Sequence, residues 1–504
     1  MPIALWYGRS YARWRTMKNY GIPFFSVVIF AVSLLVGCGS SPLAVQPAPP
    51  LSAENLNLIF VSSEDLAHHA SGDVSEATAN LTNQGLQRVL LNAAFLRKNV
   101  LANQNVNGIY ALEPMTHLQT ASQYPDMAAL EMAQQFAVLN QVTLSSDQSG
   151  GTPFTGQNFP INASYSPNAV PPDVLAPLQF CPACQGLDFS DVGGDNEAVV
   201  SKVLTAKTPG FYVFVAPWET VRELMVNADR TEGYALQLPE EYPGPNTIYA
   251  IAVAPSGSAS LVDYDTKANP GASYPTLPAP VPTTTCTVRT PESVTVTGGV
   301  DGAVVPANAN TDEVLYMIRH AEAHPQGYWS DNNYVAAGNW RALALPSALE
   351  GKSNPDEVWS GDPSSFGMGT MSNTGQNYFS GVAPPLTVVP YVIAKDLPYH
   401  LVAGFDMTAA ASASQSSQFF FTGGRFSQRK VLLGWMYVQN QQIINALFAS
   451  YYPNGGAPVV PTWSPLDYDS LWTVTFDGQG NFTVDYSRCE GIDSAALPAT
   501  APQF

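Results

Sequence analysis

The chain has 504 residues, of which 45% are hydrophobic and only 12% charged, with a net charge of −19. This composition indicates a globular protein long enough for two or three domains. The 40 acidic against 21 basic residues argue against a nucleic-acid partner, because binding to a phosphate backbone needs clustered Lys and Arg. The acidity itself needs no explanation beyond solubility.

The N-terminal segment is typical of an export signal. Lys18 precedes an apolar stretch over 22–36, which is short for a transmembrane helix and ends at Gly37-Cys38. The stretch resembles a bacterial lipoprotein signal with the cleavage box Leu-Val-Gly-Cys. The resemblance implies that residues 1–37 are removed and that Cys38 is lipidated.

A polar, Pro-rich tether over 38–54 follows the proposed cleavage site. The residue after the cysteine is Gly39, which by resemblance to such signals favours the outer membrane of the bacterial cell envelope. The lipid anchor in the membrane is then the first expected partner. An uncleaved membrane anchor is the alternative, and the tether that follows at once argues against it.

Four further cysteines, Cys181, Cys184, Cys286 and Cys489, indicate two disulfides in an exported protein, with three pairings to choose from. We expect Cys181 to pair with Cys184 and Cys286 with Cys489. The "CPAC" sequence also matches a redox motif. It lies in a Pro-rich stretch with no strand before it, which favours a structural disulfide.

The rest of the chain carries the same five landmarks twice, in the same order. In each half they are an apolar strand ending on polar residues, a Gly-x-x-Arg helix, a short strand closed by acid-Pro, a buried strand running into a helix, and a hairpin around a Gly turn. The paired segments are 56–65 with 312–322, 85–91 with 338–344, 108–114 with 357–363, 210–225 with 430–447, and 248–265 with 471–487.

This repetition predicts two domains of one fold, at 55–280 and 311–504, joined by a Pro-rich, semi-rigid linker over 281–310. Each alternates strands and helices and ends in an antiparallel hairpin. That pattern predicts the α/β class, with a largely parallel sheet flanked by helices in each domain.

The strand expected at 314–318 ends on Arg319-His320. Ligands of such sheets bind at the carboxyl ends of the strands. An imidazole at that position can attack phosphorus, and a guanidinium beside it can bind two phosphate oxygens at once. The alternative is a structural Arg-His pair that contacts nearby carboxylates.

The stretch "VLYMIRHAEAHP" resembles the Arg-His-Gly/Ala-Glu motif of the histidine phosphatase superfamily, which has the phosphoglycerate-mutase-like fold. The likeness extends through "GNWRALALPSAL", "PDEVWSGDP" and "KVLLGWMYVQNQQI", in the family's order. It implies that His320 is the nucleophile that becomes a phosphohistidine and that Arg319 binds the phosphate. Asp406 is the candidate proton donor, although a loop-capping Asp is an equal alternative. We expect no cofactor and no metal site.

The sequence departs from the family at the remaining phosphate ligands. Tyr437 stands where the family has its second His, and Ala383 or Pro384 stands where it has its second Arg. The first copy is more degenerate, because Ser62-Ser63-Glu64 replaces the Arg-His motif. Each lost donor typically costs about 10²–10³ in rate, and two losses cost roughly 10⁴ or more if they compound.

Two functions therefore compete. The missing cations favour a binding or scaffold lipoprotein with weak or lost phosphatase activity, which holds a phosphate-bearing small molecule at Arg319 and Tyr437. The alternative is an active phosphomonoester hydrolase that works through a phosphohistidine at His320. The sequence names neither the small molecule nor a protein partner.

Overall fold

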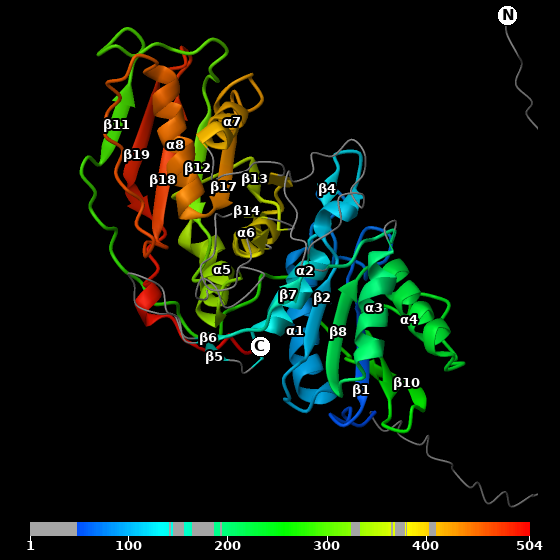
Figure 1. The fold of residues 1–504 in the computed structure, drawn as a ribbon. Helices are drawn as coiled ribbons and strands as arrows, with labels where there is room; N and C mark the ends of the chain where they lie inside the picture. The colour runs from blue at the N-terminus through cyan, green and yellow to red at the C-terminus, as the bar shows by residue number, and fades with distance from the viewer. Residues whose placement is uncertain are drawn as a thin grey trace, which may run out of the picture. The chain divides into compact units, whose positions relative to one another are not determined.

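The computed structural model describes residues 48–140, 143–144, 156–163, 186–191, 194–323, 333–363, 366–367, 378–379, 381–402 and 410–504 (Figure 1). Residues 47–504 form one compact unit. Cys38, Cys181, Cys184 and Asp406 lie outside the described residues, so the lipidation, the first disulfide and the proton donor stay predictions. Within the described ranges, no helix combines the length and apolar character needed to cross a membrane.

The first half is built on a six-stranded sheet with the order β10-β9-β1-β8-β2-β7. Strands β1, β8, β2 and β7 are parallel, whereas β9 and β10 form an antiparallel hairpin on β1. Every residue of β1 and β8 is buried, as expected for strands covered on both faces. The strands are β1 (Leu56–Ser62), β2 (Gly108–Ala111), β7 (Ile161–Asn162), β8 (Gly210–Ala216), β9 (Thr247–Val253) and β10 (Ala259–Asp265).

The second half is built on a seven-stranded sheet with the order β11-β19-β18-β12-β17-β13-β16. Apart from β11, which lies within the expected linker, this order matches the first sheet position by position. Again four strands are parallel and a hairpin lies beside the first of them. The strands are β11 (Ser293–Val296), β12 (Val314–Arg319), β13 (Glu357–Gly361), β16 (Tyr399–Val402), β17 (Lys430–Trp435), β18 (Ser470–Phe476) and β19 (Phe482–Cys489).

The helices pack as consecutive pairs, α1 with α2 and α3 with α4 in the first half, then α5 with α6 and α7 with α8. Together with the two partly parallel sheets they confirm the predicted α/β class. Their bounds are α1 (Asn83–Phe95), α2 (Ala128–Ala137), α3 (Asp195–Ala206), α4 (Trp218–Glu232), α5 (Ala336–Ala348), α6 (Ala383–Lys395), α7 (Ala410–Phe421) and α8 (Tyr437–Tyr451).

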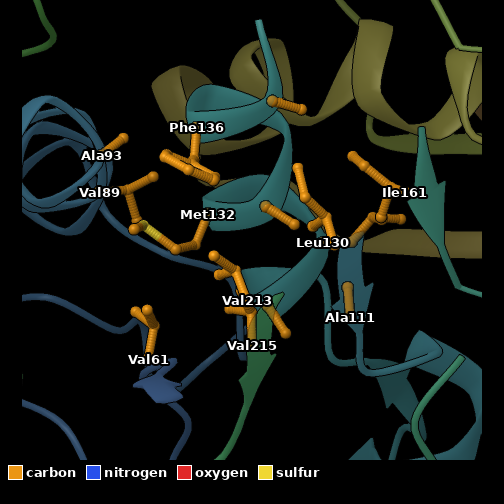
Figure 2. Close-up of a cluster of buried hydrophobic side chains, with 14 of the residues drawn as sticks. Val61, Val89, Ala93, Ala111, Leu130, Met132, Phe136, Ile161, Val213 and Val215 are labelled. Atoms are coloured by element: carbon orange, nitrogen blue, oxygen red, sulfur yellow. The ribbon is translucent and has the colours of Figure 1, made fainter. Parts of the chain in front are cut away.

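The core is continuous between the halves. In the first half, Met132 and Phe136 of α2 lie over Val213 of β8 and beside Val89 of α1 (Figure 2). The same cluster of buried apolar side chains continues into α5 and α6. A buried hydrogen bond also crosses between the halves, from Asn158 Nδ2 to the Tyr334 carbonyl at 2.6 Å.

The disulfide between Cys286 and Cys489 is present, with a Cα–Cα distance of 5.3 Å. This pairing is the one predicted for the second bridge. It joins the segment before β11 to the last residue of β19. The linker region is therefore tied to the hairpin of the second sheet both by a covalent bond and by the pairing of β11 with β19.

Candidate active site

The Arg-His motif lies at the carboxyl edge of the second sheet, as the sequence predicts. Arg319 is the last residue of β12 and stands opposite Trp435, the last residue of β17. The His320 backbone N–H donates to the Trp435 carbonyl at 2.8 Å. Because α8 begins two residues later at Tyr437, the motif and the start of this helix share one edge.

Arg319 is 3% exposed and is held between two aromatic rings. Its guanidinium carbon lies 4.7 Å from the centre of the Tyr437 ring and 3.7 Å from that of Tyr468. One terminal nitrogen donates to the Pro465 carbonyl, whereas Nε has no acceptor. Burial lowers the pKa of Arg319 from its ordinary value. Across the described ranges, no carboxylate lies within ion-pair distance of it.

His320 is 2% exposed and has a defined tautomer. Its Nδ1 lies 2.8 Å from the Ala321 carbonyl. A carbonyl only accepts, so Nδ1 carries a hydrogen, and in the neutral imidazole Nε2 then carries the lone pair. The Tyr468 ring meets the imidazole edge-on, with a centroid distance of 5.9 Å. An imidazole with its lone pair on Nε2 is the form that can attack an electrophile.

Helix α6 packs directly against the motif. The Ala321 N–H donates to Thr387 Oγ1 at 2.8 Å, and this hydroxyl donates to the Ala383 carbonyl at 2.7 Å. Ala383 and Pro384 are buried at the first two positions of the helix. The position that the family resemblance gives to a second Arg is thus occupied by small apolar side chains.

Glu322, which follows the Arg-His motif, belongs to a buried hydrogen-bond network. It accepts hydrogen bonds from Arg341 Nε at 2.8 Å and from the Ser494 hydroxyl at 2.7 Å. The same arginine also binds Glu490. Burial lowers the pKa of Arg341, but the charges of the surrounding carboxylates outweigh it and raise the pKa above the ordinary value.

At the corresponding edge of the first sheet, Ser62 and Ser63 stand in place of the Arg-His motif. The Ser63 N–H donates to the Ala216 carbonyl at 2.9 Å, the same contact that His320 makes with Trp435. Trp218 begins α4 as Tyr437 begins α8. Within the described part of the chain, the hydroxyls of Ser62 and Ser63 have no hydrogen-bond partner. Burial, then the neighbouring Asp73, raises the pKa of Glu64 to about 9, so this carboxyl is neutral at pH 7.

Tyr468 is the site residue that the sequence analysis missed. It precedes β18, which pairs antiparallel with β12 so that Leu471 lies opposite Ile318. An antiparallel neighbour begins where β12 ends, so the residues just before the predicted hairpin must lie beside Arg319. The hairpin predicted at 471–487 was therefore the signal that could have identified Tyr468 as a neighbour of Arg319.

No family model matches the chain, and no curated protein matches it. Several solved structures of the histidine phosphatase superfamily are similar to about a third of it. The protein histidine phosphatase SixA complexed with tungstate is 14% identical, with a TM-score of 0.21, over 35% of this chain and 97% of that one.

A mycobacterial glucosyl-3-phosphoglycerate phosphatase is 16% identical, with a TM-score of 0.22, over 35% of this chain and 99% of that one. Phosphoserine phosphatase from Entamoeba histolytica is 16% identical, with a TM-score of 0.19, over 32% and 90%. These values are too low to assign an activity to this chain.

Proposed function

We propose that this protein is an exported lipoprotein that binds a phosphate-bearing small molecule at Arg319 and His320, and that it hydrolyses the molecule weakly or not at all. The observation that carries the proposal is the buried guanidinium of Arg319, which has no carboxylate partner in the described part of the chain. Each cation–π contact contributes about 0.5–2 kcal/mol. Burying an ion costs several kcal/mol, so a bound anion would supply the missing counter-charge.

The weak or absent turnover follows from the neighbours of Arg319. A transferring phosphoryl group carries negative charge on three oxygens, which cations must neutralise. Tyr437 and Ala383 are uncharged, and they occupy the positions that the resemblance gives to further phosphate ligands. The alternative, a hydrolase acting through a phosphohistidine, is favoured by one observation, the Nδ1-protonated tautomer of His320.

As part of the same proposal, the two halves are copies of one phosphoglycerate-mutase-like fold, with the first copy degenerate, at 55–280 and 311–504. Two observations support this. The sheets share their strand order apart from β11. The backbone contact at the end of the first parallel strand is also the same, at Ser63 in one half and at His320 in the other.

Titration calorimetry with inorganic phosphate tests the binding site. We expect saturable binding that weakens at least 10-fold in Arg319→Gln. Arg425→Gln is the matched control, because Arg425 also lies over an aromatic ring of the second half, Phe419, at 4.5 Å. Equal affinity in the two variants would show that the anion does not bind at Arg319.

Hydrolysis of p-nitrophenyl phosphate separates the two functions. We expect turnover at least 10⁴-fold below that of an efficient phosphatase, because two donors are missing. Fast turnover that His320→Ala abolishes, with phosphate trapped on a histidine, would establish the hydrolase instead. Fast turnover that survives His320→Ala would contradict both functions.

The lipid anchor rests on the signal-like segment alone, and mass spectrometry of the membrane-extracted protein tests it. We expect the mature chain to begin at a diacylated Cys38. A mature protein that retains residues 1–37 would refute this part of the proposal.

A further inference from the structure

The carboxyl edge of the first sheet, where the phosphatase-like motif is missing, carries a cluster of two histidines and three carboxylates beside Glu64. Asp65 and His68 follow β1, His117 and Asp126 follow β2, and Glu219 is in the first turn of α4, after β8. These strands are adjacent, in the order β1-β8-β2. Ligand atoms of Asp65, His117 and Asp126 lie within 4.8 Å of one another, and so do those of Asp65, His68 and Glu219.

The imidazole of His117 is fixed in orientation and in tautomer. Its Nδ1 lies 2.8 Å from Oδ2 of Asp126, which is buried. The ring stacks on Phe189 at a centroid distance of 3.7 Å, with an angle of 3° between the planes. In the neutral imidazole, a carboxylate that accepts from Nδ1–H leaves the lone pair on Nε2, and this is the arrangement in which histidines bind metals.

The Nε2 atom of His117 faces a carboxylate across a gap. Oδ2 of Asp65 lies 4.0 Å away, too far for a hydrogen bond. Asp65 is 1% exposed, and its other oxygen accepts the His68 N–H at 2.6 Å. Within the described ranges neither Asp65 Oδ2 nor His117 Nε2 has a hydrogen-bond partner. A tetrahedral ion with bonds of about 2.0–2.2 Å sets two ligand atoms about 3.3–3.6 Å apart, so a small side-chain shift would bring both atoms into coordination range.

The gap has a charged rim that solvent can reach. His68 Nδ1 lies 3.2 Å from Oε1 of Glu219, and these two side chains are 28% and 46% exposed. The cluster contains three carboxylates and two imidazoles but no Lys or Arg. A cation is therefore attracted to it and has a route in through the exposed rim.

We propose that Asp65 and His117 bind one divalent transition-metal ion, with His68 and Glu219 as further ligands and Asp126 as the residue that positions His117. Mixed imidazole and carboxylate ligands suit Zn²⁺ and its neighbours in the first transition row, whereas Mg²⁺ and Ca²⁺ prefer oxygen alone. The proposal does not depend on the anion site of the second half.

The test uses the untagged full chain, stripped with a chelator and titrated with Zn²⁺ by calorimetry, with the metal content measured by mass spectrometry. We expect His117→Ala to weaken binding at this site at least 100-fold and Asp126→Asn to weaken it 10- to 100-fold. His69→Ala is the matched control, because His69 adjoins His68 but its Nδ1 contacts only the Ala70 carbonyl. This variant should bind zinc as the parent does.

The comparison between His117→Ala and His69→Ala is decisive, because zinc bound elsewhere, for example by Cys181 and Cys184 if their expected disulfide is reduced, contributes equally to both variants. Equal zinc affinity in these two variants would overturn the proposal. The proposal would also fail if the parent protein showed no saturable zinc binding below about 1 mM. If His117→Ala does not fold, electron paramagnetic resonance of the Cu²⁺-loaded parent tests whether an imidazole coordinates the metal. Nitrogen coupling from an imidazole is expected, and its absence would refute the site.

Discussion

Two buried arginines of the second half differ in their surroundings. Arg341 binds Glu322 at 2.8 Å and also contacts Glu490. Arg319 has tyrosine rings and a carbonyl as its neighbours. A guanidinium with carboxylate partners holds the fold together, whereas one without them is suited to bind an anion from solution. The residue type is the same in both cases, so the partners of each guanidinium distinguish the two roles.

Replacing Arg341 by Leu should destabilise the protein by about 3–5 kcal/mol, because it leaves Glu322 and Glu490 buried without a counter-charge. Urea denaturation measures the loss. The control is Arg230→Leu, which removes an exposed ion pair with Glu197 at 3.7 Å and should cost about 0–1 kcal/mol. A loss below about 1 kcal/mol for Arg341→Leu would mean that the carboxylates become neutral without cost.

The sequence located Arg319 and His320 correctly because both follow an apolar run that ends at a sheet edge. It did not reveal Tyr468, which comes from a loop 149 positions further along and meets Arg319 only in the folded chain. The sequence also did not single out His117. Its stacking on Phe189 agrees with packing, but the bond to Asp126 is a tertiary contact that one sequence cannot show.

At the scale of elements, helix α2 places a fully buried carboxyl group, that of Glu131, close to its contact with α5. Glu131 is fully buried and accepts from Gln135 Nε2 at 2.8 Å, while its second oxygen has no partner. Gln135 and Asn339 of α5 exchange hydrogen bonds of 3.2 and 3.1 Å. Burial raises the pKa of Glu131 from 4.5 to about 7, so the carboxyl is largely protonated below neutral pH.

A raised pKa in the folded state makes stability fall as pH rises. The contribution of Glu131 is fully present below pH 4.5 and is lost as pH rises through about 7, a change of about 3 kcal/mol. Glu131→Gln should remove this slope and be more stable than the parent above pH 7. Urea unfolding at pH 5 and pH 8 checks it, and parallel pH profiles for parent and variant would contradict it.

Long apolar elements were predictable and short edge elements were not. The runs at 210–216 and 430–435 form β8 and β17, and both predicted hairpins are present. Strand β7 has two residues, and β11 lies in a segment whose prolines favoured a linker. Such short strands form because a neighbouring strand supplies their hydrogen-bond partners, so their own sequences show no long apolar run or alternation that would predict a strand.

At the scale of the whole molecule, the disulfide closes a loop of 203 residues around the second half. In the chain-entropy model, a loop of this length stabilises the folded state by at most about 5 kcal/mol. The Cys286→Ser, Cys489→Ser double variant should therefore unfold at a lower urea concentration. Because Cys286 is exposed, a reductant should bring the parent to the same midpoint. A double variant as stable as the oxidised parent would show that the bridge does not constrain the unfolded chain.

The two sheets also differ at their outer edges. Strand β11 covers β19 in the second half, whereas in the first half β10 is an edge strand. An uncovered strand is a template onto which another chain can add a strand of its own. Strand β10 carries exposed Asp263 and Asp265, so two copies that approached edge to edge would bring like charges together. The acidic composition of the chain thus acts locally as protection against aggregation.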